Sequence, residues 1–356
     1  MNPSTELNEN MILQYDTSYS PANIEIISKI FSDGSISTGN YQKLLKERLQ
    51  KLTGSKYVFL TNSGTAGLHL ALMSLGISTG DKVITPSYLC EQVLNSISFT
   101  GAKPTFVDIN PDNYSINLED VKKSINNNTK AIIIPYLYGD IFSINKLKEL
   151  NIPLIEDICH CTGGSINNRH IGSLGEIGMT SFGEAKFLDG GFGGAVFTNN
   201  ADLAKKIKSM LSHSTTGKYA KNYDYNIPNV IAAVIYEKSF YIKNEIKNRK
   251  KIAKYYMDVL KNQDISLRYT NVSDSFFYRF MIDISSNKMS FIKQMRSKGI
   301  VCGVGVNNPL HELFNDFRQK LPNTKFAVKK SVALPTRPNL TQYELDRIVT
   351  AISNCL

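Results

Sequence analysis

Residues 57–75 read YVFLTNSGTAGLHLALMSL: a β-rich run, a turn of small residues and an apolar helical stretch. The aromatic and β-branched residues of 57–61 predict a strand, and the pattern of 67–75 predicts a helix. Backbone N–H groups in the turn at 62–67 can approach an anion closely, and the helix N-terminus adds partial positive charge. The segment therefore suits a phosphate, although a plain helix cap would use the same residues.

The same alternation continues outward from this unit to about residue 199. The pattern predicts an α/β sheet covered by helices, and such sheets bind ligands at the carboxyl ends of their strands. Further along, 236–260 predicts one long helix, and 276–284 and 288–298 predict a strand and a helix of a smaller C-terminal α/β domain. We expect a large domain at 1–235, including an N-terminal segment, and a small domain at 236–356. The strands predicted in the large domain are 57–61, 82–85, 104–109, 130–135, 153–157, 179–182 and 195–198, with 118–125 among the helices between them.

Composition places the chain among globular proteins with a large core. Of 356 residues, 42% are hydrophobic and 20% are charged, which is ordinary for a soluble protein. Apolar runs such as 131–135 are too short to span a bilayer, and 1–15 lacks the basic start and apolar stretch of a signal peptide. The five cysteines are scattered, which argues against a disulfide framework. We therefore expect a cytoplasmic protein with no membrane insertion.

The formal net charge of +10 suggests an anionic partner, either nucleic acid or a phosphorylated small molecule. The sharpest basic run, 243–254, interleaves with Ile246, Ile252 and Ala253 at helical spacing, so it predicts a solvated helix face. The chain has no zinc-finger cysteine pattern and no aromatic signature of single-strand binding. Nucleic acid is therefore not an expected partner.

Two further strand ends carry residues that suit cofactor chemistry. The segment 153–157 reads PLIED, and Asp157 at the end of a buried strand needs a partner, either a protonated pyridine nitrogen, a helix cap or a structural arginine. The segment 181–186 reads SFGEAK and runs into the glycine-rich 190–194. Lys186 has apolar neighbours whose desolvation would lower its pKa and make it nucleophilic, although most lysines are surface charges. The order of phosphate turn, aspartate and then lysine favours a cofactor site.

These motifs together resemble the DegT/StrS-type sugar aminotransferases, which depend on pyridoxal 5′-phosphate (PLP) and share the architecture of aspartate aminotransferase. The resemblance implies a three-layer PLP fold type I large domain with a mostly parallel mixed sheet, plus the smaller C-terminal α/β domain. The matching segments cover nearly the whole chain: 35–39, 63–65, 80–84, 106–109, 138–139, 156–157, 171–175, 181–182, Lys186, 193–194, 309–311 and 334–335.

The resemblance also implies roles for individual residues. Lys186 would hold PLP as a Schiff base and move the proton during transfer, and Asp157 would contact the pyridine nitrogen. His160 would lie near the ring hydroxyl. The phosphate would be held by Gly64, Thr65 and Ser181. The resemblance implies a homodimer with active sites at the interface, glutamate or glutamine as amino donor, and a nucleotide-linked or phosphorylated keto sugar or polyol as acceptor. It also implies a role in surface polysaccharide biosynthesis.

Four positions depart from the family pattern. Cys90 stands where an aromatic residue normally stacks on the ring, and 224–226 reads DYN instead of Asn-Tyr-Arg, so an aspartate there would repel a phosphate. Phe192 replaces a glutamate in the glycine-rich turn, and 305–306 reads GV instead of His-Tyr. The last two changes fall near the expected acceptor site. A smaller keto phosphate, such as dihydroxyacetone phosphate, is therefore an alternative acceptor.

Other functions and sites remain as alternatives. A PLP-dependent sugar dehydratase is less favoured because relatives of that kind carry histidine in place of Lys186, and a non-catalytic PLP-binding regulatory protein is a third possibility. The sequence 159–161 reads CHC, but alternate residues of a strand point to opposite faces and no second ligand pair follows, so no metal site is expected. His311 is a tentative substrate contact or a structural residue beside Pro309, and His69 is expected to be a packed core histidine.

Overall fold

The computed structural model describes residues 11–15, 19–212, 222–269, 272–316 and 320–356. The first ten residues of the 1–15 segment considered above as a signal peptide lie outside these ranges. The strands are β1 (Tyr57–Thr61), β2 (Lys82–Pro86), β3 (Lys103–Val107), β4 (Thr129–Pro135), β5 (Leu154–Asp157), β6 (Ser165–Ile166), β7 (Arg169–His170), β8 (Ile177–Ser181), β9 (Gly194–Thr198), β10 (Ile265–Ser266), β11 (Phe280–Ile284), β12 (Gly303–Val304) and β13 (Ser331–Leu334). The helices are α1 (Pro21–Ser32), α2 (Asn40–Thr53), α3 (Gly64–Ser74), α4 (Gln92–Ser98), α5 (Leu118–Ser124), a 3₁₀ turn (Leu137–Gly139), α6 (Asn145–Lys148), α7 (Ala201–Leu211), α8 (Asn229–Lys238), α9 (Ile242–Leu260), α10 (Lys288–Ser297), α11 (Leu310–Leu313), α12 (Pro322–Lys330) and α13 (Gln342–Ser353).

Seven strands form the large sheet, in the order β1-β9-β8-β5-β4-β2-β3. The pairs from β8 to β3 are parallel, whereas β9 runs antiparallel to both of its neighbours. The predicted α/β class with a mostly parallel mixed sheet is confirmed, and each of the seven predicted strands has a counterpart in this sheet. Because the parallel strands run the same way, their carboxyl ends lie along one edge of the sheet.

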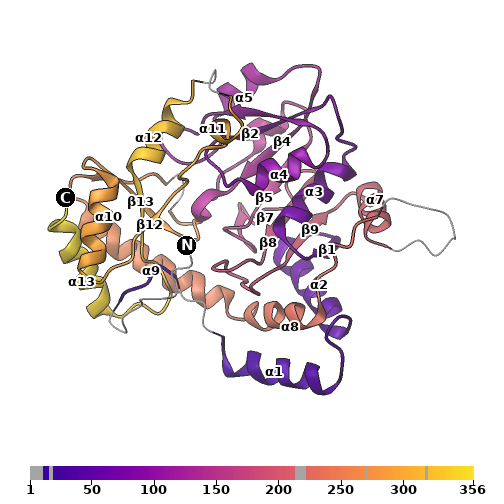
Figure 1. The fold of residues 1–356 in the computed structure, drawn as a ribbon, viewed down its shortest axis with the longest axis horizontal. Coiled ribbons are helices and arrows are strands. Elements are labelled where there is room, and N and C mark those ends of the chain that lie inside the picture. The colour runs from indigo at the N-terminus through magenta and orange to yellow at the C-terminus, as the bar shows by residue number, and fades with distance from the viewer. Residues whose placement is uncertain (1–10, 16–18, 213–221, 270–271, 317–319) are drawn as a thin grey trace.

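Helices cover both faces of the large sheet, which gives three layers (Figure 1). Strand β4 shows this directly, because Ile132 and Ile134 belong to one buried cluster and Ala131 and Ile133 to the other. The first cluster includes leucines of α2, and the second includes leucines of α3. Side chains of a strand alternate between faces, so an uninterrupted apolar run is what a doubly covered strand requires.

The C-terminal part contains a second sheet, ordered β10-β11-β13-β12 and entirely antiparallel. Its strands pack with α9, α10 and α13 around a third buried cluster, seen at one side of Figure 1. Ile12 belongs to this cluster too, and its backbone pairs with Gly299 and Val301. The division at residue 235 stays a prediction.

Two predicted elements differ from the observed ones. The single helix predicted at 236–260 is wrong, because α8 ends at Lys238 and α9 begins at Ile242. At the junction, the Ser239 hydroxyl donates to the Tyr236 carbonyl and accepts from Arg48 of α2. The strand predicted at 276–284 is shorter, because residues 276–279 do not join the sheet and Phe277 has a positive φ of 51°.

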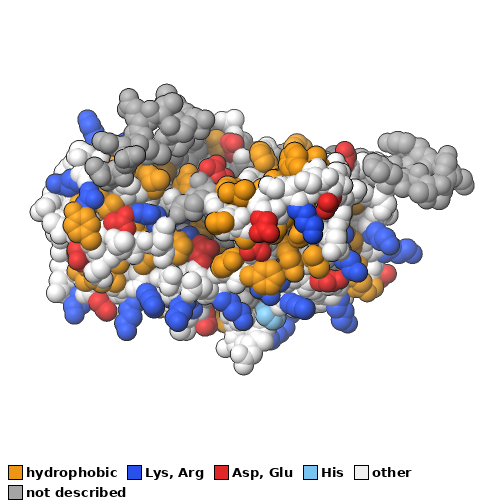
Figure 2. Space-filling view, turned by 90° about the horizontal axis from the view of Figure 1, so that it is seen from below, with side chains coloured by type: hydrophobic (Ala, Val, Ile, Leu, Met, Phe, Trp, Pro, Cys, Tyr) orange, Lys and Arg blue, Asp and Glu red, His pale blue; other side chains and the backbone are white. Residues whose placement is uncertain are grey.

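Charge on the surface is dispersed rather than gathered on the face shown in Figure 2, where acidic and apolar side chains lie between Lys and Arg. On α9, the basic run is solvated as predicted at Lys243, Lys247, Lys251 and Lys254, whereas Arg249 is buried. None of the helices in the described ranges is long and apolar enough to cross a bilayer.

Candidate active site

A cavity of about 420 Å³ lies at the carboxyl edge of the large sheet. Its volume falls within the range of roughly 300–1,000 Å³ that is typical of small-molecule sites. Residues from the C-terminal part, at 278–279 and 305–306, complete its wall. The cavity brings together all seven predicted cofactor-binding residues: Gly64, Thr65, Cys90, Asp157, His160, Ser181 and Lys186.

The turn that begins α3 forms the corner of the cavity where the sequence predicts a phosphate, through Ser63, Gly64 and Thr65. Ser63 caps α3, because its side-chain oxygen accepts from the Ala66 N–H at 3.1 Å. A Cβ on Gly64 would lie 2.7 Å from the Cβ of Ser181, so only glycine allows the helix start and the end of β8 to approach this closely. The exposed N–H groups and partial positive charge of the helix N-terminus fit the phosphate of the predicted cofactor.

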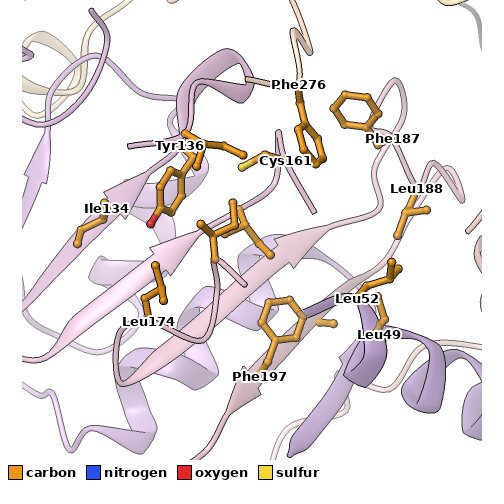
Figure 3. Packing of buried hydrophobic residues seen from close by; sticks show 14 of the residues in the cluster. Leu49, Leu52, Ile134, Tyr136, Cys161, Leu174, Phe187, Leu188, Phe197 and Phe276 are labelled. Atoms are coloured by element: carbon orange, nitrogen blue, oxygen red, sulfur yellow. The ribbon is translucent and has the colours of Figure 1, made fainter. Parts of the chain in front are cut away.

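Lys186 is positioned by the residues that follow it. Phe187 and Leu188 are buried in the first core cluster, where Phe187 packs edge to face on Phe276 with ring centroids 5.6 Å apart (Figure 3). The preceding Ala185 has a positive φ of 67°, a conformation that costs a non-glycine residue on the order of 1 kcal/mol. The buried pair therefore holds the lysine against the cavity at the expense of local backbone strain.

The net pKa of Lys186 is raised above its ordinary value, which corrects the predicted lowering. Burial lowers the pKa, as the sequence suggested, but the acidic groups that face the amine raise it by more. These groups are Tyr278, Cys159, Cys90 and Asp157. The surroundings of the free amine therefore favour its charged form.

Asp157 lies at the end of β5 on the cavity wall. One carboxylate oxygen accepts from the Cys159 N–H at 3.0 Å. Within the described ranges, no basic side chain lies at ion-pair distance from Asp157, so neither the structural arginine nor the helix cap weighed above accounts for it. The carboxylate therefore fits a protonated ring nitrogen as its partner.

His160 is held as a neutral ring of defined tautomer. Its Nδ1 accepts from the Tyr138 N–H at 3.1 Å, so the single ring proton of the neutral form lies on Nε2. Burial, together with the charges of Lys186 and Arg279, lowers its pKa well below the ordinary value. The ring stacks on Tyr278 with centroids 4.1 Å apart. His160 can therefore donate one hydrogen bond into the cavity.

Cys90 is exposed on the cavity wall, at the position where the sequence resemblance implies an aromatic residue. The other altered positions, Phe192 and 305–306, also line the cavity, but Asp224 does not. At Gly305, a Cβ would lie 2.1 Å from the Tyr88 hydroxyl and 2.7 Å from that of Tyr138. Two tyrosine hydroxyls of the large sheet's edge thus occupy the space that a side chain at 305 would need.

His311, His69 and the 159–161 segment lie in three different surroundings. His311 is 2% exposed, its Nδ1 lies 2.6 Å from the Ser87 hydroxyl and it does not line the cavity, which favours the structural alternative over a substrate contact. His69 is buried among aromatic rings, as predicted. Residues 159–161 form turns after β5 rather than extending it, so the strand argument about them is wrong. No group of three potential metal ligands occurs within the described ranges.

Sequence reasoning missed Tyr278 and Arg279. Both line the cavity, and the Lys186 amine lies 5.2 Å from the centroid of the Tyr278 ring. They precede β11 in a segment that the sequence predicted as an ordinary strand. Their link to residues 157–186 depends on how the second sheet packs against the first, for which the local sequence carries no signal.

Known proteins share this fold over nearly their whole length. An aminotransferase of the DegT/DnrJ/EryC1/StrS type from Brucella abortus is 28% identical, covers 94% of this chain and 95% of its own, and has a TM-score of 0.85. The aminotransferase TlmJ from Streptoalloteichus hindustanus is 21% identical over 97% of this chain and 98% of its own, with a TM-score of 0.89. A GDP-4-keto-6-deoxy-D-mannose-3-dehydratase from E. coli is 18% identical over 96% and 99%, with a TM-score of 0.88.

The family comparison agrees with this structural likeness. The model of the DegT/DnrJ/EryC1/StrS aminotransferase family matches residues 19–353, which include every part of the cavity. The seven-stranded sheet is the one found in PLP fold type I enzymes, as the sequence resemblance predicted. We conclude that the chain belongs to the DegT/DnrJ/EryC1/StrS aminotransferase family.

Proposed function

We propose that this chain is a PLP-dependent aminotransferase that moves an amino group from glutamate or glutamine to the ketone of a nucleotide-linked or phosphorylated sugar or polyol. One observation carries the proposal: a lysine, a carboxylate that has no ion pair among the described residues, and a helix N-terminus meet on one cavity. When bound, PLP supplies an aldehyde that condenses with amines and a ring that accepts electrons. Two solved structures with the same fold contain a cofactor of this kind. NtdA from Bacillus subtilis has bound pyridoxamine phosphate (PMP), and the E. coli dehydratase has bound hydrated PLP.

Each side chain has a proposed part. Lys186 would hold the cofactor covalently and would be the group that moves a proton at the reacting carbon. Asp157 would keep the ring nitrogen protonated, and His160 would donate a hydrogen bond from Nε2 to the ring oxygen. The phosphate is bound by Gly64, Thr65 and Ser181.

The family resemblance also supports a proposal about the location, the oligomeric state and the biosynthetic role of the enzyme. The enzyme works in the cytoplasm as a homodimer whose active sites lie at the interface, and it serves surface polysaccharide biosynthesis. The departures at Phe192 and 305–306 line the same cavity as Lys186, which keeps a small keto phosphate as the alternative acceptor.

A direct test follows the attachment of PLP. The purified chain incubated with PLP should be yellow, and after borohydride reduction, mass spectrometry should locate a phosphopyridoxyl group on Lys186. The Lys186→Ala variant should lose both signals, whereas Lys205→Ala, which removes an exposed lysine of α7, should retain them. A wild-type chain without the adduct would contradict the proposal.

The reaction itself is tested in two halves. Glutamate or glutamine should bleach the visible band and release the corresponding oxo acid, and keto sugars or small keto phosphates should restore it. The substrate that restores the band fastest identifies the acceptor class. Ammonia release with loss of a sugar hydroxyl would indicate a dehydratase instead. No bleaching with any amino donor would favour a regulatory PLP-binding protein.

A further inference from the structure

An arginine, Arg279, lines the cavity together with Asp157 and Lys186. Its guanidinium is oriented from two sides. Nη1 donates to the Val304 carbonyl at 2.8 Å, and the guanidinium carbon lies 5.7 Å from the Tyr278 ring centroid. An arginine side chain has five N–H donors. The Val304 bond uses one of them and fixes the plane of the others.

The described part of the chain provides no carboxylate partner for this arginine. Within the described ranges, no carboxylate lies at ion-pair distance from Arg279, whereas Arg249 and Arg268 pair with Glu245 and Asp283. A half-buried guanidinium without an anionic partner is costly, because it loses hydration without gaining a counter-charge. The arrangement therefore suits an anion that enters with a ligand.

Arg279 also lies close to the reacting groups. The Lys186 amine and the Arg279 guanidinium flank the same Tyr278 ring, at 5.2 Å and 5.7 Å from its centroid. The neighbouring wall at 305–306 carries only Gly and Val, so it offers no competing charge. The phosphate turn of the proposed cofactor lies on a different element, α3. A ligand of modest size could thus contact Arg279 while its reacting carbon lies at Lys186.

We propose that Arg279 binds an anionic oxygen group of the substrate, either a carboxylate of the amino donor or a phosphate of the keto acceptor. The inference rests on the proposed function, since it assumes that the substrate reacts at Lys186. A planar guanidinium binds both groups through paired hydrogen bonds, which a lysine cannot reproduce. Arg279 is thus a specificity-determining residue that selects substrates by their negative charge.

The test uses the PLP-loaded enzyme, so that the cofactor occupies its own phosphate site. Calorimetry measures binding of two unreactive probes, glutarate for the donor carboxylate and glycerol 3-phosphate for the acceptor phosphate. Arg279→Met should weaken one probe by about 10- to 100-fold and raise KM in the matching half-reaction by a similar factor. Arg279→Lys should weaken the same probe less. Arg296→Met, which removes an exposed arginine of α10, should change neither.

The outcomes separate the two anion sources and the two proposals. Weaker glutarate binding assigns Arg279 to the donor, and weaker glycerol phosphate binding assigns it to the acceptor. Equal binding of both probes by wild type and Arg279→Met, or no binding by wild type, overturns the inference about Arg279 while the Lys186 adduct remains. Absence of the adduct in wild type overturns the proposed function itself. If Arg279→Met does not fold, Arg279→Gln replaces it in the same comparison.

Discussion

His160 shows how a single backbone group decides the chemistry of a side chain. The Tyr138 N–H is directed at Nδ1, and Tyr138 itself has a positive φ of 56° in the 3₁₀ turn that follows β4. A protonated ring would place a second hydrogen on Nδ1, in conflict with that donor. The environment therefore favours the neutral ring by hydrogen bonding as well as by burial and nearby positive charge.

This predicts a pH dependence of stability. Because the pKa of His160 is lowered in the folded chain, the unfolded chain takes up a proton as pH falls below about 6.5 and the folded chain does not. Stability due to His160 is thus present above that pH and is lost as pH falls, by at most about 1.4 kcal/mol per pH unit. His160→Gln should show a shallower loss of unfolding free energy between pH 7 and pH 5 in urea titrations. If the unfolding free energies of the wild type and His160→Gln fell equally steeply between pH 7 and pH 5, the prediction would be contradicted.

At the scale of elements, the site depends on α3 beginning very close to β8 and β9. Ser63 forms a bridge with Gly193, and the Ser63 carbonyl would lie 2.5 Å from a Cβ on Gly194. Gly64 makes the equivalent close approach to Ser181. Small residues are needed here because a helix start and two strand ends share one corner, and this same corner is the proposed phosphate site.

Two glycines of this corner form a matched pair of variants. Gly64→Ala should weaken PLP binding by about 10-fold or more, because its Cβ would lie 2.7 Å from Ser181 and the corner must open, at a cost of roughly 1–3 kcal/mol. Gly67→Ala should leave PLP binding unchanged, since its nearest atoms lie 3.4 Å away. It should stabilise α3 by up to about 1 kcal/mol. Absorbance titration with PLP gives both affinities. Equal affinities of the two variants would show that the backbone at Gly64 and Ser181 can move apart without loss of PLP binding, against the prediction.

At the scale of the whole molecule, the segment around Phe276 joins the two sheets at the cavity. The Phe276 N–H donates to the Gly139 carbonyl at 2.8 Å, and its ring packs on Phe187 next to Lys186. Arg249 of α9 supports the same region. It is 5% exposed, donates to the Tyr278 carbonyl at 3.1 Å and lies 5.0 Å from the Phe187 ring centroid. Arg249 is thus a positioning residue for both sides of the cavity.

Removal of this arginine should affect stability and cofactor binding together. Arg249→Met leaves the Tyr278 carbonyl and the Glu245 carboxylate without their partner, so the free energy of unfolding should fall by about 1–3 kcal/mol. PLP affinity should fall as well, because Tyr278 and Lys186 lose their support. Lys247→Met, an exposed change on the same helix, should alter neither quantity. Lower stability with unchanged PLP affinity would assign Arg249 a structural role only.

The observed breaks in predicted elements have physical causes that local patterns do not contain. The residues between α8 and α9 are Ser239, Phe240 and Tyr241, with no glycine or proline to mark a stop. The helix ends there because Ser239 bonds to Arg48, which is remote in sequence. Similarly, the sequence left His311 as either a substrate contact or a structural residue, and only the fold places Ser87 against it.

The sequence by itself predicted the large sheet, a phosphate turn, and Asp157 and Lys186 as candidate cofactor residues, because apolar runs, small residues and chain order are local properties. Only the tertiary structure decided which groups surround Lys186, and so the direction of its pKa. It likewise brought Tyr278 and Arg279 to the cavity and set the tautomer of His160. These features depend on side chains that are far apart in the chain and meet only when the two sheets pack together, so no local pattern encodes them.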